Sequence, residues 1–268
     1  MPGGRRAMLA VTAALGALTV GATPVAAGGA VVYRYGDQAE KVVALTFDDG
    51  YFANRTEQVV AILDRYQASA TFFPYANAVL EAPALWRSIA DRYPIANHTV
   101  THPNLKRLTA SQVYGEIDGA RRIVESVINR PMVPIFRPPY GAYNTSVLTQ
   151  AYAAGFTQVA MWSVDSGDGL GLADQQVYAR AISGGNGAIV LMHAGPAVTV
   201  RVLPRVIESY RARGYRLVTL PEMLGVGWDG KPIAAAAQTL LPAPHDTPTT
   251  AVVRAPVRRS AHRAYMYI

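Results

Sequence analysis

The sequence contains no cysteine. This absence excludes disulfide bridges, zinc sites built on thiolates, and a lipid-modified cysteine at the N-terminus. Any metal ion must therefore be held by His, Asp or Glu side chains. The chain has only five histidines in 268 residues, so few positions could supply imidazole ligands.

The middle of the chain also lacks a strong excess of positive charge. The formal net charge is +7, but residues 1–30 carry two arginines and no acid, and residues 228–268 carry five basic residues against two acidic ones. A nucleic-acid-binding domain usually concentrates its basic residues on its folded part. We therefore expect no nucleic-acid partner, and we interpret the basic tail as a weak anchor to an anionic surface.

Half of the residues are apolar, which is enough for a sizeable core. The N-terminus has the three parts of a secretory signal: a basic start, an apolar stretch from Ala7 to about Ala22, and small residues before a cleavage site after Ala27. The alternative is an uncleaved membrane anchor. We predict a signal peptide over 1–27, a short lead-in over 28–39, one catalytic domain over 40–227, and an Ala/Pro/Thr-rich, poorly ordered tail over 228–268.

Between these ends, strand-like and helix-like segments alternate. Strands are predicted at 42–47, 70–76, 94–99, 133–141, 157–166, 187–195 and 215–224, and helices at 55–67, 82–93, 109–128, 144–155, 174–183 and 198–214. Repeated βα units imply parallel strands joined by helical crossovers. We predict an α/β fold, a distorted (β/α) barrel with about seven parallel strands in a single domain; a doubly wound open sheet is the alternative.

Nearly every predicted strand ends in a polar residue. The ends are Asp48-Asp49, His98 with His102, Arg137 to Gly141, Asp165 with Asp168, and His193. The carboxyl ends of parallel strands are where α/β folds gather their functional residues. Taken alone, however, Asp48-Asp49-Gly50 is also a common turn signal.

The histidines of "NHTVTHP" are spaced as i and i+4. We interpret His98 and His102 as lying on one face of a helical turn, where both could bind one metal ion. A strand-end carboxylate would complete a set of two histidines and one carboxylate, which suits a hydrolytic Zn²⁺ or a similar divalent ion.

Together these motifs resemble the polysaccharide deacetylases of carbohydrate esterase family 4. The family has five ordered motifs, T-F-D-D-G, H-[S/T]-x-x-H, R-P-P-Y, D-x-x-D-W and L-x-H. They correspond here to 46–50, 98–102, 137–140, 165–168 and 191–193. The resemblance extends from about residue 40 to residue 225.

The resemblance implies a role for each residue. Asp49, His98 and His102 would bind the metal, and Asp48, paired with Arg137, would be the general base. The Tyr140 N–H would stabilise the oxyanion, and His193, aligned by Asp165, would protonate the leaving amine. Leu191 would line the acetyl pocket. The family's tryptophan is replaced by Gly169, so that wall of the groove would either be missing or be supplied by Leu170 or Trp162.

The implied protein is a secreted or cell-wall-associated, metal-dependent deacetylase of N-acetylglucosamine polymers of the peptidoglycan or chitin type. Zn²⁺ is the expected metal, with Co²⁺, Ni²⁺ and Mn²⁺ as alternatives. The expected partner is an acetylated glycan, and we expect a monomer without stable membrane insertion after cleavage. The alternatives are an O-acetyl esterase acting on xylan and a non-catalytic wall-binding protein.

Overall fold

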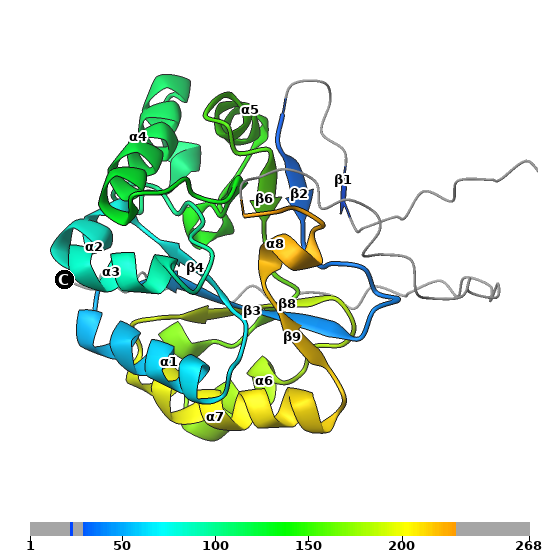
Figure 1. The fold of residues 1–268 in the computed structure, drawn as a ribbon. Coiled ribbons are helices and arrows are strands. Elements are labelled where there is room, and N and C mark those ends of the chain that lie inside the picture. Colours follow the sequence, from blue (N-terminus) through cyan, green and yellow to red (C-terminus); the bar gives the residue numbers. More distant parts are fainter. Residues whose placement is uncertain (1–21, 24–28, 229–268) are drawn as a thin grey trace, which may run out of the picture. The chain divides into compact units, whose positions relative to one another are not determined.

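The computed structural model describes residues 22–23 and 29–228 (Figure 1). The centre of the fold is strand β3 (Val42–Asp49), which pairs in parallel with β4 (Thr71–Pro74), β8 (Ala188–His193) and β9 (Arg216–Val218). Strand β7 (Val164–Asp165) pairs in parallel with the other edge of β8. Strand β3 is almost entirely apolar up to Phe47 and is buried on both faces, as expected for a sheet covered by helices.

A second sheet has the order β1-β2-β6-β5, made of Ala22–Thr23, Val31–Tyr33, Gln158–Ala160 and Ile135–Phe136. Parallel bridges from Phe72 to Ile95 and from Asn97 to Phe136 connect it to β4, and an antiparallel bridge from Tyr35 to Ala188 connects it to β8. Because these bridges join the first sheet to the second at both β4 and β8, the strands form a distorted barrel. The predicted (β/α) barrel is confirmed, and the open sheet is excluded.

Helices surround these strands (Figure 1). The described helices are α1 (Ala53–Arg65), α2 (Ala76–Glu81), α3 (Pro83–Ala90), α4 (Ala110–Ile128), α5 (Thr145–Ala153), α6 (Asp174–Ala181), α7 (Ala197–Ala212) and α8 (Leu220–Met223). Helix α7 packs against both α1 and α6. In α4, Thr109 and Gln112 form a capping box, and Asn129 ends the helix in the left-handed conformation.

Three sequence expectations were wrong in detail. The segment 157–166 was predicted as one strand, but it forms β6 and β7, which belong to different sheets. Residues 94–99 form only isolated bridges. Strand β2 lies inside the segment expected to be a lead-in. In each case the pairing depends on contacts with distant strands, which local periodicity does not encode.

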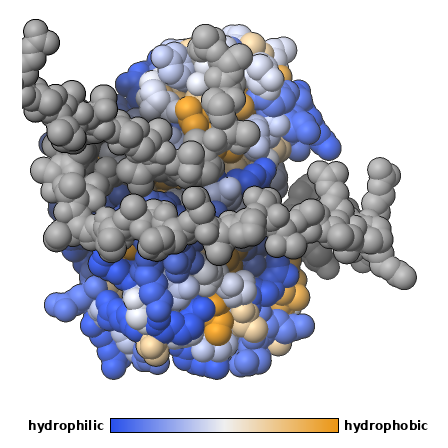
Figure 2. All heavy atoms as spheres, turned by 90° about the vertical axis from the view of Figure 1, so that its right-hand side faces the viewer, coloured by the Kyte–Doolittle hydropathy of each residue, from blue (hydrophilic) through white to orange (hydrophobic). Residues whose placement is uncertain are grey.

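Most of the predicted signal peptide and tail lie outside the described residues. The exceptions are Trp228 and β1, whose backbone pairs antiparallel with β2. In the part of the chain that the structure describes, no helix has the length and apolar character needed to cross a bilayer. The face in Figure 2 is mainly hydrophilic where it is described, and its hydrophobic residues form small, separate spots.

Two glycines, Gly50 and Gly115, provide a test of how tightly the chain packs around them. Gly50 has φ +86°, and a Cβ there would lie 2.3 Å from the buried Trp86 ring. We expect Gly50→Ala to lower the free energy of unfolding by about 2 kcal/mol or more in urea denaturation. Gly115, in α4, has nothing within 4 Å of an added Cβ. Gly115→Ala should instead raise the free energy of unfolding by about 0.5–1 kcal/mol. Equal effects would contradict this description of the packing.

Candidate active site

The carboxyl ends of β3 and β8 bring the first site residues together. Asp48 is directly opposite His193 in the parallel ladder, and the Ala194 N–H donates to the Asp48 carbonyl at 3.0 Å. The predicted strand therefore runs two residues further than expected, through both aspartates. The predicted gathering of functional residues at this end is observed.

Backbone geometry allows two adjacent carboxylates to face one site. Along a strand, alternate residues share a face, so Thr46 and Asp48 point the same way. Asp49 would point to the opposite face, but its φ of +72° ends the alternation. As a result, carboxylate oxygens of Asp48 and Asp49 lie 3.8 and 3.7 Å from His98 Nε2.

Arg137 is fully buried and organises the site. Its guanidinium donates to Asp48 Oδ1 at 2.6 Å and Thr46 Oγ1 at 2.9 Å, and also to the carbonyls of Ala160 and Met161. The Arg137 carbonyl accepts a hydrogen bond from His98 Nδ1 at 2.7 Å. The charge of Asp48 is therefore compensated although the carboxylate is almost completely buried.

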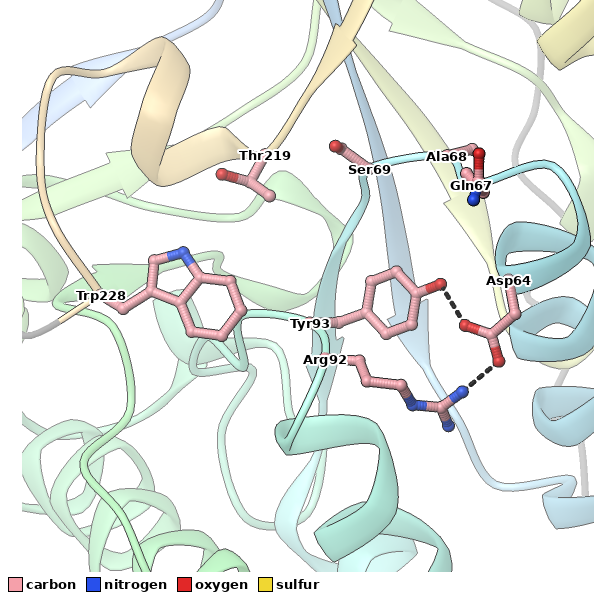
Figure 3. A pocket seen from close by; sticks show the side chains of 8 residues that line it. All are labelled: Asp64, Gln67, Ala68, Ser69, Arg92, Tyr93, Thr219 and Trp228. Atoms are coloured by element: carbon pink, nitrogen blue, oxygen red, sulfur yellow. Dashed lines mark hydrogen bonds and ion pairs between the residues drawn. The ribbon is translucent and has the colours of Figure 1, made fainter.

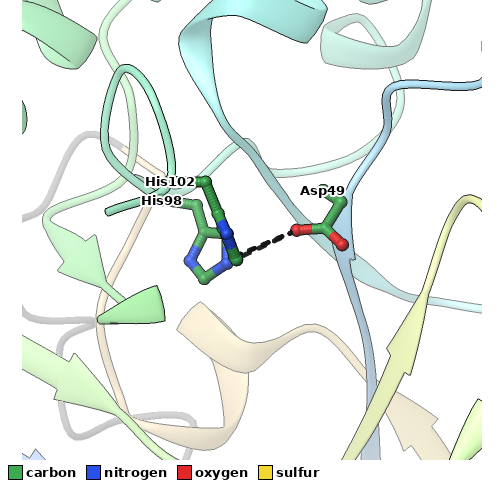
Figure 4. A group of neighbouring side chains, drawn as sticks. All are labelled: Asp49, His98 and His102. Atoms are coloured by element: carbon green, nitrogen blue, oxygen red, sulfur yellow. Dashed lines mark ion pairs between the residues drawn. The ribbon is translucent and has the colours of Figure 1, made fainter. Parts of the chain in front are cut away.

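Asp49, His98 and His102 form a compact group (Figure 4). One ligand atom from each lies within 4.8 Å of the others, and Asp49 Oδ1 is 3.4 Å from His102 Nε2. Because a carbonyl can only accept, the proton of His98 is on Nδ1, and Nε2 presents a lone pair to Asp49. Asp49 Oδ1 is buried and has no hydrogen-bond partner among the described residues. Converging lone pairs around an orphaned buried oxygen fit a cation.

The two histidines are not on a helical turn, contrary to the sequence interpretation. Residues 98–102 form a loop in which Thr99 has φ +73° and His102 φ +60°. Two residues that the sequence analysis missed hold this loop. The Asn97 side chain accepts from the Thr99 N–H, and Glu116 accepts from the N–H groups of Val100 and Thr101. The i, i+4 spacing does bring the two imidazole rings together, but in a strained loop and not on a helical turn.

His102 is more exposed than His98 and contacts Tyr140. Its Nδ1 lies 3.2 Å from the Tyr140 hydroxyl, and the two ring centroids are 4.7 Å apart. Burial, together with the nearby His98, lowers the pKa of His102 to about 4. The neutral imidazole keeps a lone pair for a metal ion.

His193 is aligned by Asp168 and not by Asp165, so this sequence expectation was wrong. Asp168 Oδ1 lies 2.7 Å from His193 Nδ1, and its Oδ2 accepts from the His193 N–H and from the Thr199 hydroxyl. Asp165 instead accepts from the Gly167 N–H and lies 3.7 Å from Arg180. The reason is geometric: the left-handed Gly167 turns the chain after β7 so that the second aspartate enters the barrel.

The Asp168–His193 pair is charged. Burial alone would lower the pKa of His193, but the charge of Asp168 and its hydrogen bond raise that pKa to about 10. Burial would raise the pKa of Asp168, but the charge of His193 and the hydrogen bonds from His193 and Thr199 lower it. Below pH 10, His193 Nδ1 therefore donates to Asp168, and Nε2–H remains available to a substrate.

The sequence of this chain is similar to those of known proteins. A family model described as polysaccharide deacetylase matches residues 35–159. A chitooligosaccharide deacetylase from Bradyrhizobium is 33% identical over 211 residues, covering 72% of this chain and 96% of that protein. A peptidoglycan-N-acetylglucosamine deacetylase from Bacillus cereus is 31% identical, with 69% of this chain and 89% of that protein covered.

This chain belongs to the polysaccharide deacetylase family, carbohydrate esterase family 4. Its enzyme class is therefore that of hydrolases acting on amide-linked acetyl groups of carbohydrates. The family also contains a pseudoenzyme from Bacillus anthracis, whose crystal structure matches with a TM-score of 0.68 and 26% identity over 75% of this chain and 70% of that chain.

The remaining residues suggested by the family motifs border the site. Leu191 is buried on β8, two residues before His193. Trp162 is half-buried, with its ring 5.9 Å from the Arg137 guanidinium, and it touches the loop at Gly141. A Cβ at Gly169 would lie 3.8 Å from the His193 ring, whereas Leu170 is 65% exposed. Trp162 is thus more buried than Leu170, the other candidate for this wall of the groove.

A hollow elsewhere on the surface is not part of this deacetylase site. Its lining residues, all labelled in Figure 3, are Asp64, Gln67, Ala68, Ser69, Arg92, Tyr93, Thr219 and Trp228. Its charged groups are already paired, since Asp64 accepts hydrogen bonds from both Arg92 and Tyr93. None of its lining residues is a histidine, so the hollow has no group of a carboxylate and histidines like that at Asp49.

The role of Asp168 can be tested by NMR titration of metal-free protein. Replacing Asp168 with Asn removes the anion that outweighs burial, so we expect the pKa of His193 to fall from about 10 to below the ordinary 6.5. The stabilising effect of the charged pair, complete below pH 6.5 and lost towards pH 10, should disappear as well. Asp165→Asn is the matched control. A shift of the His193 resonance by Asp165→Asn alone would refute the assignment.

Proposed function

We propose that this chain is a secreted, metal-dependent hydrolase that removes N-acetyl groups from N-acetylglucosamine polymers. The names of the Bradyrhizobium and Bacillus cereus relatives support this substrate class. The predicted signal over residues 1–27 supports export to the cell wall, where a peptidoglycan substrate would lie. Zn²⁺ is the favoured metal because two imidazoles and one carboxylate with open positions suit it.

One observation carries this proposal: the two adjacent aspartates have different partners. Asp48 is bound to the buried Arg137, whereas Asp49 has an oxygen without a hydrogen bond beside two imidazole nitrogens. A carboxylate oriented by a guanidinium through one oxygen can accept a proton on the other oxygen, and a carboxylate without a hydrogen-bond partner is suited to bind a cation. A divalent ion held by Asp49, His98 and His102 would polarise the acetyl carbonyl and acidify a water molecule.

The residues of the chain would then move two protons. Asp48 Oδ2 takes a proton from the attacking water while Oδ1 stays bound to Arg137. The Tyr140 N–H donates to the oxygen that becomes negative as the water oxygen bonds to the carbonyl carbon. His193 Nε2 gives its proton to the nitrogen as the carbon–nitrogen bond breaks, leaving acetate and the free amine. Leu191 packs against the acetyl methyl group.

An acetate-release assay separates this function from its alternatives. Metal-loaded protein should release acetate from N-acetylated chitooligosaccharides or peptidoglycan fragments, and a chelator should stop the release. Release from acetylated xylan alone would favour the esterase alternative. Because the family includes a pseudoenzyme, a wall-binding protein is the second alternative. It would bind the glycan without releasing acetate, and that result would refute the proposed activity.

Two substitutions test the division between Asp48 and Asp49. Asp48→Asn should retain the metal, measured by elemental analysis, but lose at least about 10²-fold in kcat because the base is gone. His98→Ala should lose the metal. Since a buried Arg137 without its partner costs about 3–5 kcal/mol, thermal denaturation must confirm that Asp48→Asn is folded. Full activity of folded Asp48→Asn would show that another group is the base.

A further inference from the structure

A hollow of about 550 Å³ lies next to the proposed catalytic site. It is lined by Asn104, Lys106, Arg107, Tyr140, Gly141, Ala142 and Tyr143. These residues come from the two loops that also carry His102 and Arg137. Tyr140 borders both the hollow and the proposed catalytic site. Its hydroxyl contacts His102 Nδ1, and the residue is 68% exposed. A glycan whose acetyl group lies at His102 would therefore extend past Tyr140 into this hollow.

The hollow is basic. Lys106 and Arg107 are exposed, and within residues 29–228 neither forms an ion pair with a carboxylate. No lining residue is acidic. Arg34 adds a third cation at the rim, where its guanidinium lies 3.4 Å from the Tyr143 hydroxyl. By contrast, Arg92, Arg130, Arg201 and Arg216 all have carboxylate partners within the protein.

The backbone holds the two cations in place. They lie on a single turn of 3₁₀ helix, Leu105–Arg107, which begins at Asn104. The Asn104 side chain accepts from the Lys106 N–H, and its carbonyl accepts from the Arg107 N–H at 3.0 Å. Leu105, between Asn104 and the cations, is 1% exposed and anchors the turn in the core. A fixed turn lowers the entropy lost when the side chains bind an anion.

We propose that this hollow is a subsite for a carboxylate on a sugar next to the one that is deacetylated. The inference rests on the proposed deacetylase function and narrows its substrate to an acidic, peptidoglycan-type glycan, in preference to neutral chitin. A guanidinium can bind a carboxylate through two parallel hydrogen bonds, and an ammonium supplies a second charge. The carboxylate can belong to a lactyl group on the sugar or to a peptide attached to that group.

Four substrates of equal sugar length test the subsite. They are an N-acetylglucosamine oligomer, an alternating oligomer whose second sugar bears a lactyl carboxylate, the same oligomer with that carboxylate amidated, and the same oligomer with attached peptides. We expect kcat/KM to be about tenfold higher for the carboxylated than for the amidated oligomer. The difference should shrink as salt is added, because both cations are exposed. Preference for the peptide-bearing oligomer alone would assign the carboxylate to the peptide.

The double substitution Lys106→Gln and Arg107→Gln should reduce that tenfold ratio to nearly one. The control is Arg65→Gln, which removes an exposed cation at the end of α1 and should leave the ratio unchanged. Binding of the carboxylated and amidated oligomers to Asp48→Asn, measured by calorimetry, should show the same preference without turnover.

The subsite would be refuted if the amidated oligomer reacted as fast as both the carboxylated and the peptide-bearing oligomers, or if the double substitution slowed all of these oligomers alike. These outcomes differ from a failure of the proposed function. If the protein were not a deacetylase, metal-loaded wild-type protein would release acetate from none of the four substrates, and the subsite proposal would be refuted together with the activity.

Discussion

The buried ion pair between Arg137 and Asp48 is the interaction on which the rest of the site depends. Arg137 connects three other parts of the barrel, because its side chain reaches β3 and the carbonyls of Ala160 and Met161 at the end of β6, and its backbone pairs with Asn97. The same residue sets the proton position on His98 through its carbonyl. Removing one partner of a buried pair leaves an uncompensated charge, at about 3–5 kcal/mol. The pair therefore links the folding of the barrel to the geometry of the proposed chemistry.

Backbone strain is concentrated around this pair. Asp49, Thr99, His102 and Tyr140 all have positive φ without being glycine. Each costs on the order of 1 kcal/mol, since the Cβ approaches the following carbonyl. The strain is tolerated because the side chains of Asn97 and Glu116 accept hydrogen bonds from backbone N–H groups of the histidine loop and fix it. In return, residues adjacent in sequence present their side chains to the same site, which regular strand or helix geometry would prevent.

Much of the fold was predictable because its signals are local. The apolar runs of β3 and β8 and the helical segment 109–128 were read directly from the sequence. The candidate residues at the strand ends were also found, since ordered motifs identified them. The alignment of His193 by Asp168 was missed because it depends on a turn at Gly167, and two aspartates three residues apart look equivalent in sequence. Asn97 and Glu116 were missed because their role exists only in the folded loop, although Asn97 directly precedes His98.

The central claim is that Asp48 and Asp49 have separate roles, and a crystal soaked with Zn²⁺ tests it most directly. Anomalous scattering should place one ion bound by Asp49, His98 Nε2 and His102 Nε2, with Asp48 still hydrogen-bonded to Arg137. An ion bound by Asp48 in place of Asp49, or an Asp48 that has left Arg137, would contradict the division between ligand and base.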